Sequence, residues 1–228
     1  MDKAEVFQRI VEVGIVPVVR AASSEDALRA AEAVSLGGIP IVEITMTVPG
    51  AVEVIRSLIK QRGGELLIGA GTVLDPQMAR RCIEAGAQFL ASPGLDLETV
   101  AFARAQGKVM FAGALTPTEV LAAFKAGSDF VKVFPCNALG GPKYIASLRG
   151  PLPQVHLVPS GGVSLQTAQE FILAGAAALA AGGELVDAAA LRSGKLETIA
   201  QNARSFVEVV RKTRGRAKAA APAGVARS

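Results

Sequence analysis

Short runs of apolar residues alternate along the chain with longer segments in which apolar positions recur at helical spacing. Eight such runs can be counted, and each is apolar almost throughout rather than at every second position. This continuity is typical of parallel strands that are buried on both faces. The runs are IVPVVR (15–20), IPIVEIT (39–45), ELLIGAGT (65–72), QFLASP (88–93), VMFAGAL (109–115), DFVKVFP (129–135), QVHLVPSGG (154–162) and AAALAAGG (176–183).

The segments between these runs carry the start and stop signals of helices. Asp75 and Thr116 each precede a proline, which places a side-chain cap before a proline in the first helical turn, and Glu119 completes a capping box with Thr116. Glycines follow the ends of several segments, where a helix commonly finishes in a left-handed residue. These glycines are Gly86, Gly127 and Gly175.

A repeated helix, stop and strand unit indicates the fold class. The phrase occurs as EAGAQFLASP, KAGSDFVKVFP and LAGAAALAAGG. Eight units of this kind predict an α/β protein with a (β/α)8 TIM barrel, in one domain over residues 1–212, with an additional terminal helix over about 196–211. A doubly wound open sheet is the alternative, because local patterns do not show whether a sheet closes.

The net charge changes the picture only at the C-terminus. The chain carries a formal charge of +4, but six of its 24 basic residues and none of its 20 acidic ones fall in 211–228. The remaining 210 residues therefore hold 18 basic and 20 acidic side chains, which does not indicate nucleic-acid binding. We expect 213–228 to be a basic, flexible, solvated tail, and a tail that binds nucleic acid or a partner is the alternative.

The compartment is predicted from cysteines and apolar stretches. The two cysteines, Cys82 and Cys136, form neither a disulfide framework nor a metal-binding spacing. The N-terminal segment lacks the apolar core of a signal peptide, and no apolar run approaches the ~20 residues that span a bilayer. The sequence therefore predicts a cytoplasmic protein that binds no membrane and no metal.

If the barrel is correct, functional side chains should gather at the C-terminal ends of the strands. Lys132 is flanked by Val131 and Val133 in the sixth run, where an ammonium group is costly to desolvate. Burial favours the neutral amine, which is the nucleophile that attacks a ketone to form a Schiff base. The structural alternative is a lysine that reaches solvent or pairs with one carboxylate.

Glu43 holds the matching place in the second run, between Val42 and Ile44. Schiff-base chemistry needs several proton transfers, and one carboxylate can serve them all. A structural ion pair between Glu43 and Lys132 is the alternative, and both roles are compatible.

Paired glycines end the last two runs, as Gly161 and Gly162 after Ser160 and as Gly182 and Gly183. These are the two strand ends at which barrels commonly bind phosphate through backbone N–H groups. Either pair alone could be a turn, but their matching positions favour a phosphate site. Ser164 is interpreted as a helix N-cap.

In addition, the sequence closely resembles the 2-keto-3-deoxy-6-phosphogluconate and 2-keto-3-deoxy-6-phosphogalactonate aldolases over nearly its whole length, apart from the basic tail. The matching segments are PVVRA (17–21), GGIPIVEITMTVP (37–49), IGAGTVL (68–74), AGAQFLASPG (85–94), GALTPTE (113–119), KVFPCNALGGPKYI (132–145) and VPSGGVS (158–164).

The resemblance implies a class I aldolase that needs no cofactor or metal, is commonly a homotrimer, and acts on a phosphorylated keto acid. It implies that Lys132 is the Schiff-base lysine and Glu43 the proton shuttle. It also implies that Gly161 and Gly162 hold the phosphate. The residues that it implies in the pyruvyl pocket are Thr72, Pro93, Phe134 and Ser160.

Two positions depart from the family pattern. Thr47 stands where some members carry an arginine for the substrate carboxylate, and Arg20 at the end of the first run is the alternative cation. Gly183 stands where many relatives carry a serine that contacts the phosphate. Without compensation, the loss of such a hydrogen bond weakens binding by about 1.5–3 kcal/mol.

Two other functions fit part of the pattern. A phosphate-binding barrel isomerase or synthase would share the glycine pairs but would not require Lys132. A catalytically weak assembly or binding protein would share the fold alone.

Overall fold

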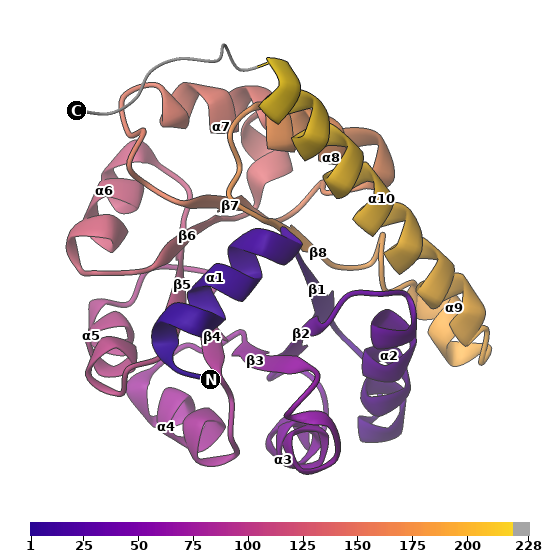
Figure 1. Ribbon diagram of the computed structural model, residues 1–228. Helices are drawn as coiled ribbons and strands as arrows, with labels where there is room; N and C mark the ends of the chain where they lie inside the picture. The colour runs from indigo at the N-terminus through magenta and orange to yellow at the C-terminus, as the bar shows by residue number, and fades with distance from the viewer. Residues whose placement is uncertain (221–228) are drawn as a thin grey trace.

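The strands form one parallel sheet that closes into a barrel. The computed structural model describes residues 1–220, and within it the strand order is β7-β6-β5-β4-β3-β2-β1-β8. A bridge between Ser160 and Ala180 joins β7 to β8 and completes the ring. The predicted barrel is therefore confirmed, and the open doubly wound sheet is excluded (Figure 1). The strands are β1 (Ile15–Val19), β2 (Ile41–Thr45), β3 (Leu67–Gly71), β4 (Phe89–Ala91), β5 (Val109–Ala114), β6 (Phe130–Val133), β7 (Leu157–Pro159) and β8 (Leu179–Ala181).

A ring of helices surrounds the strands. Their predicted caps are present: Asp75 accepts a hydrogen bond from the Met78 backbone, and Thr116 and Glu119 form a capping box. The predicted stop glycines Gly86, Gly127 and Gly175 all have positive φ. The outer helices are α2 (Ser24–Leu36), α3 (Ala51–Arg62), α4 (Pro76–Glu84), α5 (Leu97–Ala105), α6 (Pro117–Lys125), α7 (Pro142–Arg149), α8 (Leu165–Leu173) and α9 (Ala188–Arg192), with a 3-10 turn η1 (Cys136–Leu139).

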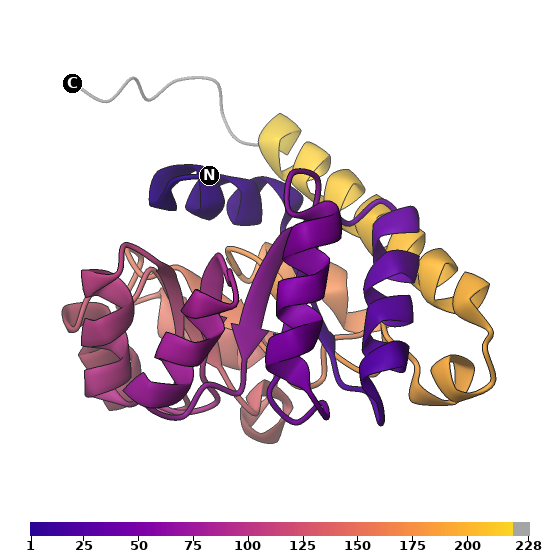
Figure 2. The ribbon, with the colours of Figure 1, turned by 90° about the horizontal axis from the view of Figure 1, so that it is seen from below.

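One end of the barrel is covered by the first helix, α1 (Lys3–Val13). Phe7 of this helix stacks on Phe130, the first residue of β6, with ring centroids 4.7 Å apart. Since Phe130 begins its strand, α1 lies across the N-terminal end of the barrel (Figure 2). The opposite end, where the strands finish, is therefore the end that remains for a functional site.

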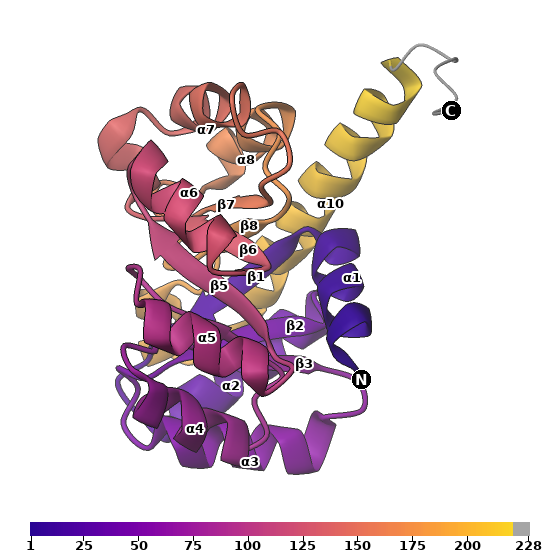
Figure 3. The same ribbon diagram turned by 90° about the vertical axis from the view of Figure 1, so that its left-hand side faces the viewer.

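The last helix is longer than the sequence predicted. Helix α10 spans Leu196–Ala220, whereas the prediction ended it near 211. Thr213 is buried, and Arg214 donates hydrogen bonds to three backbone carbonyl oxygens, so the chain is held beyond the predicted domain end at 212. These contacts hold the C-terminal part of α10 at the same end of the barrel as α1 (Figure 3). The predicted flexible tail is thus wrong for its first residues, and 221–228 lie outside the described residues.

Within the described residues, no helix combines the length and apolarity that a bilayer span needs.

Candidate active site

Lys132 and Glu43 meet inside the barrel. Lys132 lies on β6 and Glu43 on β2, strands on opposite sides of the ring, and Lys132 Nζ is 3.4 Å from Glu43 Oε1. Lys132 is 5% exposed and Glu43 is 2% exposed. Lys132 is the next-to-last residue of β6, and Glu43 is the middle residue of β2. The sequence prediction that these two residues share one buried place agrees with this geometry.

A buried ion pair is weak evidence for stability, since desolvation of two charges offsets most of their attraction. The contact nevertheless allows a proton to pass between the amine and the carboxylate, which is what an amine nucleophile and its acid–base partner require. The arrangement therefore has a chemical use that an apolar pair of the same size would lack.

A glycine-lined hollow of about 130 Å³ lies at the same end of the barrel. Phe134, which follows Lys132 by two residues, lies on its wall. Ser160, which is 6% exposed, is also part of the wall, and its bridge to Ala180 brings the two glycine pairs together. Of the predicted residues, the hollow is lined by Arg20, Phe134, Ser160, Gly161, Gly162, Gly182 and Gly183.

Two glycines of the hollow have left-handed backbone conformations. Gly161 and Gly162 have φ of 88° and 75°, values that favour glycine over residues with a side chain. Arg20 supplies a positive charge on the wall. Glu184 also lines the hollow and was missed by the sequence reasoning, although its place directly after Gly183 was the available signal.

Three further predicted residues lie at strand ends but outside the lining of this hollow. Thr47 shares a 2.8 Å hydrogen bond with Thr45, whose hydroxyl lies 2.9 Å from the Val19 carbonyl oxygen at the end of β1. Thr72 directly follows β3 and adopts φ of 59°, which is unusual for a β-branched residue. Pro93 follows β4 and is half-buried.

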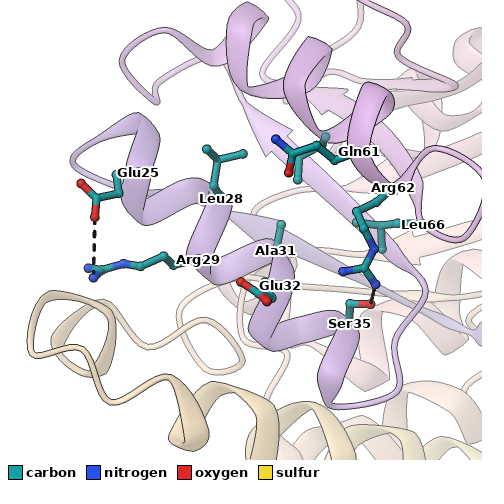
Figure 4. Close-up of a pocket in the computed structure, with 10 residues that line it drawn as sticks. Glu25, Leu28, Arg29, Ala31, Glu32, Ser35, Gln61, Arg62 and Leu66 are labelled. Atoms are coloured by element: carbon teal, nitrogen blue, oxygen red, sulfur yellow. Dashed lines mark hydrogen bonds and ion pairs between the residues drawn. The ribbon is translucent and has the colours of Figure 1, made fainter.

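A second hollow lies on the outside of the barrel between α2 and α3 (Figure 4). Its charged residues contact neighbouring side chains, as in the hydrogen bond of 3.3 Å from Arg62 to Ser35 and the ion pair of 4.0 Å between Arg29 and Glu25. None of the strand-end residues lines it. It is therefore not a candidate for the chemistry of Lys132.

Over residues 1–220, no three or more His, Cys, Asp or Glu side chains gather as metal ligands would. The single histidine, His156, is exposed just before β7, with its ring packed edge-on against Phe7 at 5.1 Å.

The fold and the site together define a (β/α)8-barrel protein with a buried lysine–carboxylate pair beside a glycine-lined hollow. More particularly, the chain belongs to the KDPG and KHG aldolase family, whose model matches residues 6–202. The family resemblance in the sequence motifs is thereby confirmed.

Individual relatives match most of the chain. It is 35% identical to the KHG/KDPG aldolase of Escherichia coli over 195 residues, which is 85% of this chain and 91% of that one. It is 34% identical to the 2-dehydro-3-deoxy-phosphogluconate aldolase of Treponema pallidum, over 90% of this chain and 97% of that one. It is also similar to a crystal structure of the KDPG aldolase from Legionella pneumophila with pyruvate captured as a covalent carbinolamine. That comparison gives a TM-score of 0.82 at 29% identity, covering 88% of this chain and 97% of that one.

Proposed function

We propose that this protein is a class I aldolase that reversibly cleaves 2-keto-3-deoxy-6-phosphogluconate, or its galactonate epimer, to pyruvate and D-glyceraldehyde 3-phosphate. The observation that carries the proposal is the buried contact of 3.4 Å between Lys132 Nζ and Glu43 Oε1. The covalent carbinolamine in the Legionella relative supports it, because that adduct precedes an iminium on the reaction path.

Lys132 is the nucleophile of the proposed reaction. Its neutral amine adds to the C2 ketone, and loss of water from the carbinolamine gives an iminium. Glu43 then takes the proton of the C4 hydroxyl, and the C3–C4 bond breaks as its electron pair moves toward the iminium. Glyceraldehyde 3-phosphate leaves, and the remaining enamine is protonated at C3. Hydrolysis of the new iminium releases pyruvate and returns the free lysine.

The hollow is proposed to hold the phosphoryl group. Backbone N–H groups of Gly161, Gly162, Gly182 and Gly183 are the donors, and Arg20 adds charge. This seat anchors the far end of the substrate, so that its binding energy orients C2 toward Lys132.

The pyruvyl end of the substrate is proposed to lie among Thr72, Pro93, Phe134 and Ser160. Thr47, which hydrogen-bonds to Thr45, is proposed to contact the substrate carboxylate in place of an arginine. Thr47 carries no charge, and Arg20, which lines the hollow, is the alternative partner for that carboxylate.

We also propose that the enzyme is a homotrimer and acts in the cytoplasm. The homotrimer is the assembly that the sequence resemblance implies. The two cysteines are unpaired and buried, which suits a reducing compartment. Light scattering after size exclusion measures the mass of the assembly directly.

The experiment that tests the function is reductive trapping. Treatment with pyruvate and borohydride should add one reduced pyruvyl group to the peptide that contains Lys132. A Lys132→Met variant should lose both the adduct and pyruvate release, whereas the exposed Lys125→Met should keep both. Turnover of the two C4 epimers is compared in the same assay. A Lys132→Met chain that retains wild-type turnover would refute the assignment.

A further inference from the structure

Gly71 ends β3 directly beside the carboxylate of Glu43. The neighbouring strand β2 runs parallel to β3, with Glu43 paired to Gly69 and Thr45 paired to Gly71. A Cβ atom placed on Gly71 would lie 1.7 Å from Glu43 Oε1 and 2.3 Å from its carboxyl carbon. The carboxylate therefore fills the volume that any larger residue at position 71 would need.

The backbone conformation does not explain this glycine. Gly71 is not among the residues with positive φ, so an L-amino acid can adopt its backbone angles. A glycine inside a strand costs about 0.5–1 kcal/mol relative to alanine, because the unfolded chain loses more freedom when it folds. The structure explains the glycine by the space that the neighbouring Glu43 carboxylate occupies.

The backbone at Gly71 is less free to move than the Glu43 side chain. Glu43 is 2% exposed and is held by its contact with Lys132. The Met46 amide donates a 2.8 Å hydrogen bond to the Gly71 carbonyl oxygen, which fixes the backbone on the Gly71 side. Just beyond, Thr72 turns the chain with φ of 59°. A methyl group at position 71 would therefore displace the carboxylate rather than the strand.

We propose that Gly71 is a positioning residue for the reaction, because its missing side chain leaves the space in which Glu43 faces Lys132. The inference rests on the proposed function for its kinetic consequence. Its steric basis is independent of that function.

The test is the Gly71→Ala variant. Misplacement of a reacting group by about 1 Å can cost about 100-fold in rate, and we expect a loss of at least this size in kcat/KM. The matched control is Gly69→Ala on the same strand, whose Cβ would lie 2.2 Å from the Phe89 ring and whose three nearest atoms all belong to Phe89. Gly69→Ala should lower stability but keep kcat per folded molecule.

A double-mutant cycle separates positioning from general damage. In a Glu43→Ala chain the space beside Gly71 is free, so Gly71→Ala should change kcat/KM by less than about twofold there. The same coupling should appear in urea unfolding: Gly71→Ala lowers the midpoint when Glu43 is present and not when it is alanine. If Gly71→Ala alone does not fold, Glu43→Ala must restore folding.

Equal effects of Gly71→Ala in both backgrounds would overturn the positioning role, as would wild-type kcat/KM in the single variant. Failure of the proposed function gives a different result. In that case the wild-type chain turns over no keto acid and forms no adduct on Lys132, while the coupling in the unfolding midpoints still reports whether Gly71 makes space for Glu43.

Discussion

Arg214 should stabilise the barrel by tying the last helix to its N-terminal end. Its Nη1 atom donates to the carbonyl oxygens of Val11 at 2.6 Å and Glu12 at 3.0 Å, and its Nη2 atom donates to Ala177 at 2.8 Å. The first two acceptors belong to the last turn of α1, whose final carbonyl groups have no partner within the helix. The third precedes β8. One guanidinium thus joins α10 to the segments that lead into β1 and β8.

The size of the effect follows from these three bonds. A hydrogen bond to a charged group contributes about 1.5–3 kcal/mol, and the low end applies because Arg214 is only half-buried. Burial also lowers the pKa of its guanidinium, so part of the gain offsets desolvation. We expect Arg214→Ala to lower the free energy of unfolding by about 2–4 kcal/mol in total. In a chain of this length each kcal/mol shifts Tm by about 2–4 °C, so Tm should fall by roughly 4–16 °C.

Thermal and urea unfolding measure this loss, with Arg211→Ala as the control. Arg211 is exposed on the same helix, and its removal should change stability by less than about 0.5 kcal/mol. A chain that ends at residue 212 should lose as much stability as Arg214→Ala. If Arg214→Ala and Arg211→Ala are equally stable, the three carbonyl contacts do not hold the helix in solution and the reasoning fails.

Three other variants or reagents test separate parts of the structure. Glu184→Gln removes a negative charge from the wall of the hollow, so the inhibition constant of inorganic phosphate should fall about two- to fivefold relative to the wild-type enzyme. An unchanged inhibition constant would mean that phosphate binds elsewhere. Backbone N–H groups of Thr116 and Leu115 lower the pKa of Glu119, so its capping contribution is present above the unfolded-chain pKa and is lost as pH falls through the folded-state pKa. Glu119→Gln should therefore flatten the acid limb of stability against pH, and a parallel limb would contradict this. Burial raises the pKa of the Cys82 and Cys136 thiols to about 11, so iodoacetamide at pH 8 should alkylate neither until the protein is unfolded, as mass spectrometry can show.

The fold could be predicted because its signals are local. Each strand is a short apolar run, and caps such as Asp75 and Thr116 mark where helices begin. Closure is not a local signal, since it depends on the pairing of the first strand with the last, as between Val16 and Ala180, which are far apart in the sequence. The end of α10 was misjudged for the same reason. Its basic sequence is typical of a solvated tail. Arg214 is fixed by carbonyl oxygens of α1 and of the segment before β8, which are far away in the sequence.

The candidate site residues could be picked out from the sequence where a charged residue interrupts an apolar run. Lys132 and Glu43 are charged residues inside buried strands, so their positions attract notice without any structure. Gly71 and Glu184 do not place a charge inside a buried apolar run. The sequence suggests that some neighbour packs closely against Gly71, but it does not say which one. The structure identifies that neighbour as the Glu43 carboxylate. An acid after paired glycines is ordinary until Glu184 is found on the wall of the hollow.

The two ends of the barrel differ in what their contacts do: one end carries stabilising contacts and the other carries the candidate active site. At the N-terminal end, α1 covers the strands, Phe7 stacks on Phe130, and Arg214 joins three segments, so that end is closed by contacts that serve no visible reaction. The other end contains features that lower the stability of the fold. These are a buried ion pair, a strained Thr72, and glycines that weaken strands. Replacement of Lys132 and Glu43 by an apolar pair would be expected to leave stability unchanged or higher. Their presence is therefore better explained by the proposed reaction with a bound ketone than by a contribution to stability.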